Sequence, residues 1–566
     1  MNLRQYPLFF RTLINLRFIQ IFYRIWYGVR PQALTHLRSD PQRTSYNVDW
    51  TALKPNAPFI TYNWLVANEI ARGRFLFLQK TADDSDKINW QAPGKGRLWR
   101  YNLHYFQYLF PHGGLASNIG LSLIRNWMDH NPFGTRDAWD PFPVSLRLVN
   151  WIKYLSVIPA SDTDLRPIVR SAYMQTSWLE RSIEYHLLGN HLFKNAKALL
   201  FAGLFFKSND AQRWLSKGLR LLHHEIEEQI LPDGGHFERS PMYHTMILED
   251  CLDLLNVCQV LPNRALQKFS ELLLTTTHNM INFIVALTHP DGNIALFNDS
   301  AFGIESPPSD LVSYYKNVTK ENVPDLKNFD KSFAVTGYFI MTPRPCDRLL
   351  VDCGPIGPKY QSGHAHCDTL SFELSLKGRR VIVDSGCYHY EKSSMRQYNR
   401  GNAGHNTLTI DKQNQSEIWD VHRCARRARP LYAKLKTHST GTIHFEGAHD
   451  GYHRLPGSPT HHRRIVWSGQ ICRIEDKVEG KGLHEIESRL HIHPSLSVVF
   501  KENEVSIQSD HEELLKISLG QGGCIQRREG WYCPEFGIKM RCPVLLTTHK
   551  SVSLPFKEVW ILKISK

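Results

Sequence analysis

The chain has 566 residues, of which 42% are hydrophobic and 22% are charged, and its formal net charge is +14. This is the composition of a soluble globular protein of roughly two to four domains. A positive field attracts polyanions, but there is no RNP signature, zinc-finger spacing or long Lys/Arg run. Acidic glycan or anionic lipid is therefore favoured as a partner over nucleic acid.

The 11 cysteines are scattered from Cys251 to Cys542, and none forms a CxxC pair. An odd number of cysteines without such pairs is not typical of a disulfide framework or of a thiolate zinc site. The pattern suits a reducing compartment.

Residues 1–50 are predicted to be an amphipathic helical segment, with a helix over residues 3–28. Arg11, Arg17, Arg24 and Arg30 interrupt every apolar run, so no stretch is long enough to span a bilayer. No small-residue cleavage site follows, so a cleavable secretory signal is not expected. Such a helix could lie on an anionic membrane surface, or it could pack on the body of the protein.

Residues 51–333 are predicted to be helical. Apolar residues recur every three or four positions, as in 191–206 and 246–261, and short loops carry Pro, Gly, Asp and Asn. Repeated helix pairs of this kind predict a helical toroid or solenoid.

Residues 334–566 change to short alternating or β-branched segments separated by turns rich in Gly, Asn and Asp. This pattern predicts an antiparallel β-sandwich. Because the helices precede the strands, the two parts are expected to form separate domains.

Several histidines lie in Gly-rich turns of the strand region. His364 and His366 are two residues apart in SGHAHCD, and on an extended strand their rings would point the same way. Asp384 ends an apolar strand and His405 precedes another. His366, Asp384 and His405 could hold one divalent metal, with zinc as the natural candidate, or could simply hydrogen-bond one another.

A second polar set lies in the helical region. Asn190 and His191 open a helix in GNHLFKNAKAL, and the segment DGGHFERSPMYH supplies His236, Glu238, Arg239 and Tyr243. Polar residues this dense beside Gly suggest a lined cleft. The alternative is that Asn190 caps its helix and Tyr243 is a buried, hydrogen-bonded ring.

A third set interleaves polar and aromatic side chains in LWRYNLHYFQYL. Asn102, His104 and Tyr105 could form a wall on which sugars stack, or this segment could begin a core helix.

These segments, taken in order, resemble the heparinase II/III family. The matching pieces are FYRIWYGVRP, LWRYNLHYFQYL, FPVSLRLVNWIKY, GNHLFKNAKALLFAG, DGGHFERSPMYH, HPDGNIALFNDS, GHAHCDTLSFEL, VIVDSGCYHYE and RGNAGHNTLTID. The resemblance implies an (α/α) toroid followed by an antiparallel β-sandwich, and β-elimination on uronic-acid polysaccharides.

The resemblance also implies roles for individual residues. Tyr243 corresponds to the catalytic Tyr and His364 to the catalytic His, while Asn190 or His191 corresponds to the carboxylate-neutralising residue, with Asn190 preferred. His366, Asp384 and His405 match the zinc ligands found in parts of the family, and no organic cofactor is implied. Arg400, in RGNAGHNTLTID, is a further candidate for substrate contact.

The expected reaction is abstraction of the C5 proton of a uronic acid residue with departure of O4. The chain is similar to the branch of the family found among bacterial exopolysaccharide and lipopolysaccharide synthesis proteins, which favours a cytoplasmic or peripheral inner-membrane location, with the periplasm or cell envelope as the alternative. Competing hypotheses are a uronyl C5-epimerase and a non-catalytic glycan-binding component of a synthesis complex. Hydrolysis by paired carboxylates, with Glu238 and Asp299 as candidates, ranks last.

Overall fold

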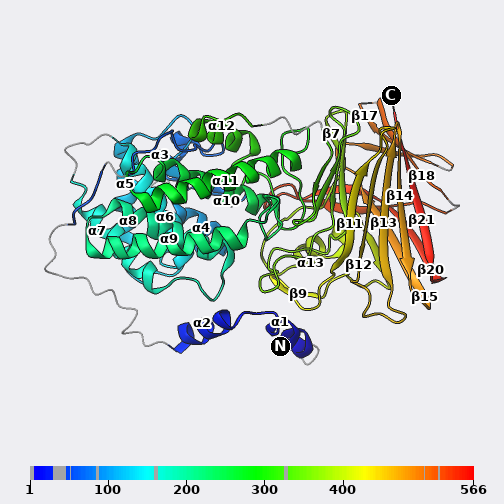
Figure 1. The fold of residues 1–566 in the computed structure, drawn as a ribbon, viewed down its shortest axis with the longest axis horizontal. Coiled ribbons are helices and arrows are strands. Elements are labelled where there is room, and N and C mark those ends of the chain that lie inside the picture. The colour runs from blue at the N-terminus through cyan, green and yellow to red at the C-terminus, as the bar shows by residue number, and fades with distance from the viewer. Residues whose placement is uncertain are drawn as a thin grey trace.

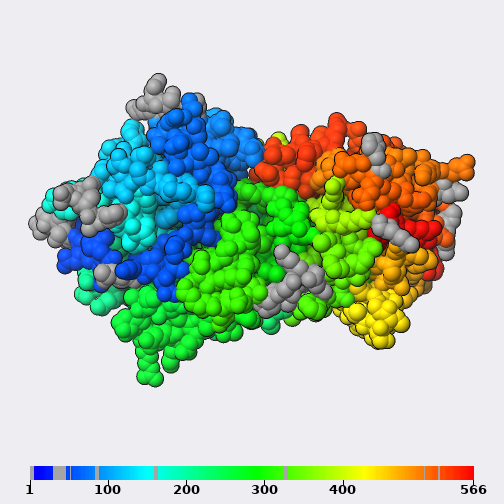
Figure 2. Space-filling view, turned by 90° about the horizontal axis from the view of Figure 1, so that it is seen from above, coloured from blue at the N-terminus to red at the C-terminus, as the bar shows by residue number. Residues whose placement is uncertain are grey.

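The computed structural model describes residues 5–29, 46–50, 53–83, 88–158, 164–323, 329–502, 504–510, 512–520 and 523–565. A helical half is followed by a half built of antiparallel sheets, as the change of sequence period predicts. Figure 1 shows the helices at one end of the long axis and the strands at the other. Figure 2, turned by 90°, shows the same two lobes side by side.

The helical half consists of helix pairs arranged as a toroid. Its principal helices are α4 (Arg97–Tyr105), α5 (Ser117–His130), α6 (Pro141–Val157), α7 (Arg166–Arg181), α8 (Gly189–Phe205), α9 (Asn209–Gln229), α10 (Pro241–Cys258), α11 (Arg264–Leu287) and α12 (Pro308–Thr319). A short helix α3 (Ala67–Ala71) and the hairpin β1 (Arg74–Phe77) and β2 (Lys80–Asp83) precede them.

Burial separates inner from outer helices in this half. α6, α8 and α10 bury residues on almost every side, whereas α5, α7 and α9 bury one stripe each. A helix that is apolar all round must lie inside, and an amphipathic helix covers it. The inner helices therefore supply the side chains that face the interior of the toroid.

The described residues of the sheet half form three larger sheets and the two-stranded sheet β10-β9. Five strands run in the order β3-β4-β5-β6-β7, eight in the order β11-β12-β13-β14-β21-β18-β17-β16, and four in the order β19-β20-β15-β8, all paired antiparallel. The bounds are β3 (Lys331–Phe333), β4 (Tyr338–Met341), β5 (Arg348–Asp352), β6 (Phe372–Leu376), β7 (Arg379–Ile382), β8 (Leu408–Ile410), β9 (Ile418–Asp420), β10 (Arg423–Cys424), β11 (Pro430–Thr437), β12 (Ile443–His449), β13 (Thr460–Ser468), β14 (Ile471–Glu479), β15 (Leu483–His491), β16 (Ser497–Phe500), β17 (Val505–Ser509), β18 (Glu512–Leu519), β19 (Gln526–Tyr532), β20 (Met540–Ser553) and β21 (Phe556–Ile564).

The sheets pack face to face around one apolar core. Phe372 and Leu374 of β6 meet Trp467 of β13 and Trp560 of β21 in the same buried cluster. In β13 and β14 buried residues alternate with less buried ones, which is the period expected of a strand with one face in the core. This arrangement is the β-sandwich that the sequence predicts.

The two halves are in contact at the connection between α9 and α10. Asp233 accepts hydrogen bonds from the backbone and the hydroxyl of Thr336, and Arg239 Nε donates to the Thr336 carbonyl at 2.9 Å. These contacts fix how the toroid faces the sandwich, and so fix the groups that meet between them.

The N-terminal segment forms two helices, α1 (Tyr6–Leu13) and α2 (Phe18–Val29), rather than the single predicted helix over 3–28. The turn between them is stabilised locally, because Asn15 Nδ2 donates to the Arg11 carbonyl and Gln20 Oε1 accepts from the Arg17 backbone N–H. Of the predicted segment 1–50, residues 1–4 and 30–45 lie outside the described residues. No helix among the described residues is both long and apolar enough to cross a membrane.

Candidate active site

A cavity of about 1060 Å³ lies where the two halves meet. Asn190 and Tyr243 line it from the helical half, and His364, Tyr390 and His422 line it from the sheet half. Side chains far apart in the sequence therefore face one space large enough for a short oligosaccharide.

Asn190 lies in the first turn of α8, directly after a sharp turn of the backbone. Leu188 and Gly189 both have positive φ, of 63° and 56°, and a Cβ on Gly189 would lie 2.2 Å from Gln361 Oε1 of the sheet half. Glycine at this position lets the helix start against the loop that carries His364. Asn190 is 1% exposed, so its carboxamide is held in one orientation.

Tyr243 lies three residues after the cap of α10. The Ser240 hydroxyl accepts from the Tyr243 backbone N–H at 3.3 Å and donates to the carbonyl of Asp299 at 2.7 Å. The Tyr243 hydroxyl lies 3.2 Å from that of Tyr390. Burial raises the pKa of Tyr243 well above its usual range, so the phenol is protonated at neutral pH.

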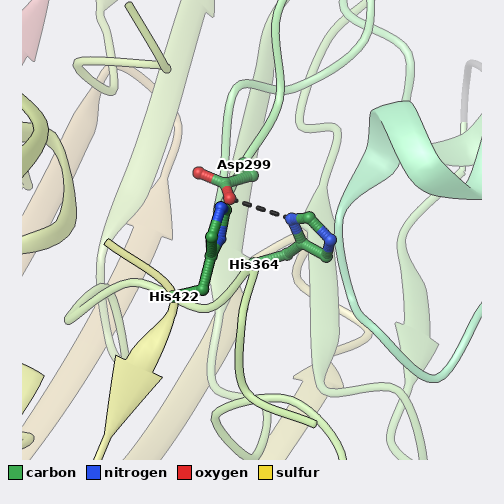
Figure 3. A group of neighbouring side chains, drawn as sticks. All are labelled: Asp299, His364 and His422. Atoms are coloured by element: carbon green, nitrogen blue, oxygen red, sulfur yellow. Dashed lines mark hydrogen bonds and ion pairs between the residues drawn. The ribbon is translucent and has the colours of Figure 1, made fainter. Parts of the chain in front are cut away.

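His364 packs directly on Tyr243. Their ring centroids are 4.0 Å apart and the planes are tilted by 33°. His364 Nδ1 lies 3.0 Å from Asp299 Oδ2, as the dashed line in Figure 3 marks, and His422 approaches the same carboxylate from another side. Because an ionised carboxylate only accepts, Nδ1 carries the proton and Nε2 keeps its lone pair.

The segment from 361 to 370 is a loop, as the Gly-rich turn predicts, so the strand geometry in which the His364 and His366 rings would point the same way does not apply. Its carbonyls bond to a side chain instead of to a neighbouring strand: Arg400 donates to Ser362 and to Ala365. Both imidazoles nevertheless contact the Asp299 carboxylate. His364 Nδ1 lies near Oδ2, and His366 Nε2 lies near Oδ1.

Asp299 is a buried hub behind the cleft. Its oxygens meet His364, His366 Nε2 at 2.8 Å and both terminal nitrogens of Arg396, and the Cys387 thiol lies 3.3 Å away. Burial alone would raise the pKa of Asp299, but the Arg396 guanidinium outweighs it and holds the pKa well below its usual range. The carboxylate is therefore ionised and fixes the tautomers of both histidines.

Glu238 links Asn190 to His364. Its Oε1 accepts from Asn190 Nδ2 at 3.0 Å, and its Oε2 lies 3.6 Å from His364 Nε2. Glu238 and Asp299 are 2% and 0% exposed, and neither lines the cavity. Because paired carboxylates must flank the bond they cleave, the hydrolytic hypothesis that named these two acids has no geometric basis.

A sealed cluster lies behind the cleft. His366 Nδ1 and His405 Nε2 are buried without a hydrogen-bond partner, their rings are 5.4 Å apart, and Asp368 completes a group whose ligand atoms lie within 4.8 Å of one another. Asp384 instead accepts from His405 Nδ1 at 2.7 Å. The structure thus places Asp368 with the two histidines, and it places the predicted ligand Asp384 behind His405, where it fixes the tautomer.

The other predicted residues divide by whether they reach the cavity. His191, Asn102 and Tyr105 line it, and His191 Nδ1 is held 3.0 Å from Glu184 Oε1. Four do not line it. His104 is a core residue that accepts from Trp127 Nε1, and His236 is bonded to Gln229.

Arg239 and Arg400 are the other two predicted residues that do not line the cavity, and both stabilise loops. Arg239 donates to the carbonyls of Phe237 and Thr336, and Arg400 donates to four backbone carbonyls around the His364 loop. Both guanidinium groups are occupied by backbone oxygens, so the prediction that Arg400 touches substrate is not supported by its position. It shapes the loop instead.

Sequence reasoning missed several groups of the site. Tyr390, His422, Asp368 and Arg396 were not singled out, and Asp299 was considered only for hydrolysis. Tyr390 and His422 lie in loops whose residue patterns carry no signal of their own. Asp368 was the closest to being found, because it stands two residues after His366 in GHAHCD.

Comparison with known proteins places this geometry in a family. The model described as "Heparinase II/III N-terminus" matches residues 65–329, and "Heparinase II/III-like, C-terminal" matches residues 327–558. The "Heparin-sulfate lyase" of Pedobacter heparinus is 26% identical over 59% of this chain and 55% of its own length, and that of Bacteroides thetaiotaomicron is 26% identical over 67% and 59%. The chain thus spans little more than half the length of these curated relatives.

Solved structures agree on the fold. Heparinase III superimposes with a TM-score of 0.69 at 19% identity, covering 100% of this chain and 92% of that one. The heparan sulfate lyase of Pedobacter heparinus gives a TM-score of 0.59 at 21% identity, covering 96% and 87%. These likenesses confirm the predicted toroid followed by a sandwich.

Proposed function

The chain belongs to the heparinase II/III family, and from this premise we propose that it cleaves a uronic-acid-containing acidic polysaccharide by β-elimination. The observation that carries the proposal is the meeting of Tyr243 and His364 in one cavity, with ring centroids 4.0 Å apart, beside Asn190. A phenol from the helices and an imidazole from the sheets can then act on one sugar ring.

The reaction needs a base at C5 and an acid at O4. His364 keeps a lone pair on Nε2 because Asp299 holds the proton on Nδ1. Tyr243 is protonated because burial raises its pKa, so it is suited to protonate the departing O4. Positioned proton transfers of this kind contribute about 10²–10⁴-fold each. In substrates whose C5 proton and O4 leave from the same face, Tyr243 would perform both transfers, and it would first have to lose its own proton, which its raised pKa disfavours.

The uronate carboxylate must be stabilised as C5 loses its proton, because negative charge then spreads onto its oxygens. Asn190 Nδ2 has two hydrogens, of which one is donated to Glu238, so the second is available to the carboxylate. One well-aimed donor of this kind contributes about 2.7–4 kcal/mol. His191 is turned to Glu184, which favours Asn190 for the role.

One divalent cation, zinc by its preference for nitrogen and oxygen donors, is part of the proposal. His366 Nδ1, His405 Nε2 and Asp368 would hold it, and the two partnerless imidazole nitrogens are the observation that supports a fit. When bound, the cation would stabilise the loop that carries His364 and would not touch substrate.

The substrate is proposed to be an acidic glycan of bacterial exopolysaccharide or lipopolysaccharide metabolism. Arg24, Arg423 and Arg427 line the cavity, and none has a carboxylate within 3.5 Å among the described residues. Arg427 Nε is moreover buried without a hydrogen-bond partner. Such a basic wall would attract the acidic groups of a polymer.

The test is to incubate the full chain with a panel of uronic-acid glycans, heparan sulfate included, and to follow the ultraviolet absorbance of the C4–C5 double bond. Tyr243→Phe should reduce turnover by about 10²–10⁴-fold while the circular dichroism spectrum is unchanged. Tyr432→Phe, on the far strand β11, is the matched control and should retain full activity.

Two outcomes would point elsewhere. Full turnover by Tyr243→Phe would remove this residue from the mechanism. Solvent deuterium entering C5 without new absorbance would identify an epimerase, which uses the same abstraction but returns the proton to the other face.

A further inference from the structure

The outer surface of α1 and α2 is the most concentrated apolar surface on the described part of the molecule. Ten large hydrophobic side chains between Tyr6 and Val29 are exposed, against fourteen in all the other described residues together. Ile14 is 83% and Phe18 is 80% exposed. The ten are Tyr6, Phe10, Ile14, Phe18, Ile19, Ile21, Phe22, Ile25, Trp26 and Val29.

The opposite face of the same helices contacts the protein at several points. Arg11 Nη1 pairs with Glu417 at 3.0 Å in the sheet half, and Arg17 pairs with Glu228 in the helical half. Gln20, which is 2% exposed, donates to the Leu187 carbonyl, and the Tyr23 ring packs on Tyr185. These contacts set the orientation of the helices, so their apolar face points away from the protein.

The helix pair crosses the mouth of the cleft. Phe9, Leu13 and Leu16 line the cavity, together with Arg24. Figure 1 shows α2 running beneath the helical half and α1 beneath the sheet half, so the segment bridges the two. Both helices precede residue 65, where the match to the family models begins.

The positive charge around this apolar face favours an anionic binding partner. The first 39 residues contain six arginines and no Asp or Glu. Arg24 of α2, Arg423 of β10 and Arg426, which follows β10, are exposed. A second copy of a chain with net charge +14 would bring like charges together, whereas an anionic bilayer supplies opposite charge and an apolar interior.

We propose that the outer face of α1 and α2 docks on an anionic phospholipid bilayer, lying in the interface without crossing it. Phe18, Phe22 and Ile25 enter the acyl region, Trp26 lies at the level of the headgroups, and Arg426, which does not line the cavity, meets phosphates. The cleft mouth then faces the membrane, which places the enzyme where membrane-bound glycan is made. The docking does not depend on the chemistry proposed for the cleft.

The test is co-sedimentation of the full-length protein with vesicles of phosphatidylcholine containing phosphatidylglycerol, compared with pure phosphatidylcholine. The protein should bind the anionic vesicles, and binding should weaken as salt rises. The double variant Ile14→Ser, Phe18→Ser should bind about tenfold more weakly or worse, because two buried apolar side chains are lost at the interface. Neither residue lines the cleft, so turnover of soluble oligosaccharide should be unchanged.

Leu483→Ser is the matched control, because Leu483 is 69% exposed on β15, away from the helix pair. It should bind vesicles as the parent does. Failure of the parent to bind anionic vesicles, or equal binding by the double variant, would overturn the proposal. A parent dimer in mass photometry that the double variant converts to a monomer, with no vesicle binding by either, would assign the face to self-association and overturn it as well.

Discussion

His364 and His366 stand two residues apart, yet they belong to two different regions of the molecule. His364 lies in the cleft against Tyr243, whereas His366 is sealed in the cluster with His405 and Asp368. Both donate to the same carboxylate, Asp299. The ring that can reach a substrate is suited to proton transfer, and the ring without solvent access is suited to structure.

The comparison also shows why one buried acid can serve both regions. Asp299 fixes the proton of His364 on Nδ1 and that of His366 on Nε2, so that the opposite nitrogen of each ring is free. In His364 the other nitrogen, Nε2, lies 3.6 Å from Glu238 Oε2. In His366 the other nitrogen, Nδ1, is buried without a hydrogen-bond partner beside His405. The following predictions test whether the two regions can be separated.

Asp299→Asn should have the largest effect, because it removes the group the two regions share. Arg396, 2% exposed, would keep its charge without a carboxylate partner, and losing one member of a buried pair costs about 3–5 kcal/mol of the free energy of unfolding. Urea denaturation measures this loss. Asp164→Asn, at an exposed ion pair with Arg166, is the control and should leave the free energy of unfolding unchanged within error. A variant as stable as the parent would contradict the assignment of Asp299 as a hub.

A pair of single substitutions should separate activity from stability. His364→Ala should lower turnover by about 10²–10⁴-fold with little change in the free energy of unfolding, because its ring faces the cavity. His366→Ala should instead lower stability, because its ring is completely buried. Turnover assays and denaturant unfolding on both variants check this. Loss of stability in His364→Ala, with loss of turnover but not of stability in His366→Ala, would contradict the assignment of the two histidines to different regions.

Removal of a bound metal should affect the sealed cluster first. If His366, Asp368 and His405 hold a cation, a chelator should lower the thermal midpoint, and adding zinc at 100 times its dissociation constant should restore about 2.7 kcal/mol. Native mass spectrometry should find one metal per chain. His405→Ala should show neither effect, and a chelator response that persists in this variant would place the metal elsewhere.

Acidification should have the smallest effect per residue. Burial lowers the pKa of His104 to about 3 and that of His244 to about 4, so both stay neutral in the folded protein while the unfolded chain takes up protons below about pH 6.5. Stability from these groups is therefore present above pH 6.5 and is lost as pH falls towards their folded pKa values, by about 1.4 kcal/mol per group and pH unit. His104→Gln should flatten the decline of the thermal midpoint between neutral and mildly acidic pH. An unchanged slope would show that His104 does not contribute.

Much of the fold follows from local pattern. The helical period up to about residue 319 and the alternation after residue 331 are properties of neighbouring residues, and they predict the toroid and the sandwich correctly. The N-terminal segment was predicted to be helical, but the turn at 14–17 was missed, because it depends on side-chain contacts of Asn15 and Gln20 with the backbone.

The candidate site was only partly accessible from sequence. Tyr243, His364 and Asn190 stand in polar segments beside glycine, so residue type and context pointed to them. Arg400 also stands in a polar segment beside glycine, yet its guanidinium donates its hydrogen bonds to backbone carbonyls. Residue type alone does not separate these cases, because each depends on which neighbours satisfy the polar atoms.

The sequence by itself determined the order of the two domains and the amphipathic character of the N-terminus, and it singled out Asn190, Tyr243 and His364 as candidates. Only the tertiary structure decided that Tyr243 and His364 stack, that Asp299 joins two histidines, and that Asp368 rather than Asp384 stands between the free nitrogens. Periodicity is set by a residue and its near neighbours and can be read along the chain. The meeting of distant side chains is set by how the toroid packs on the sandwich, and no local pattern encodes that geometry.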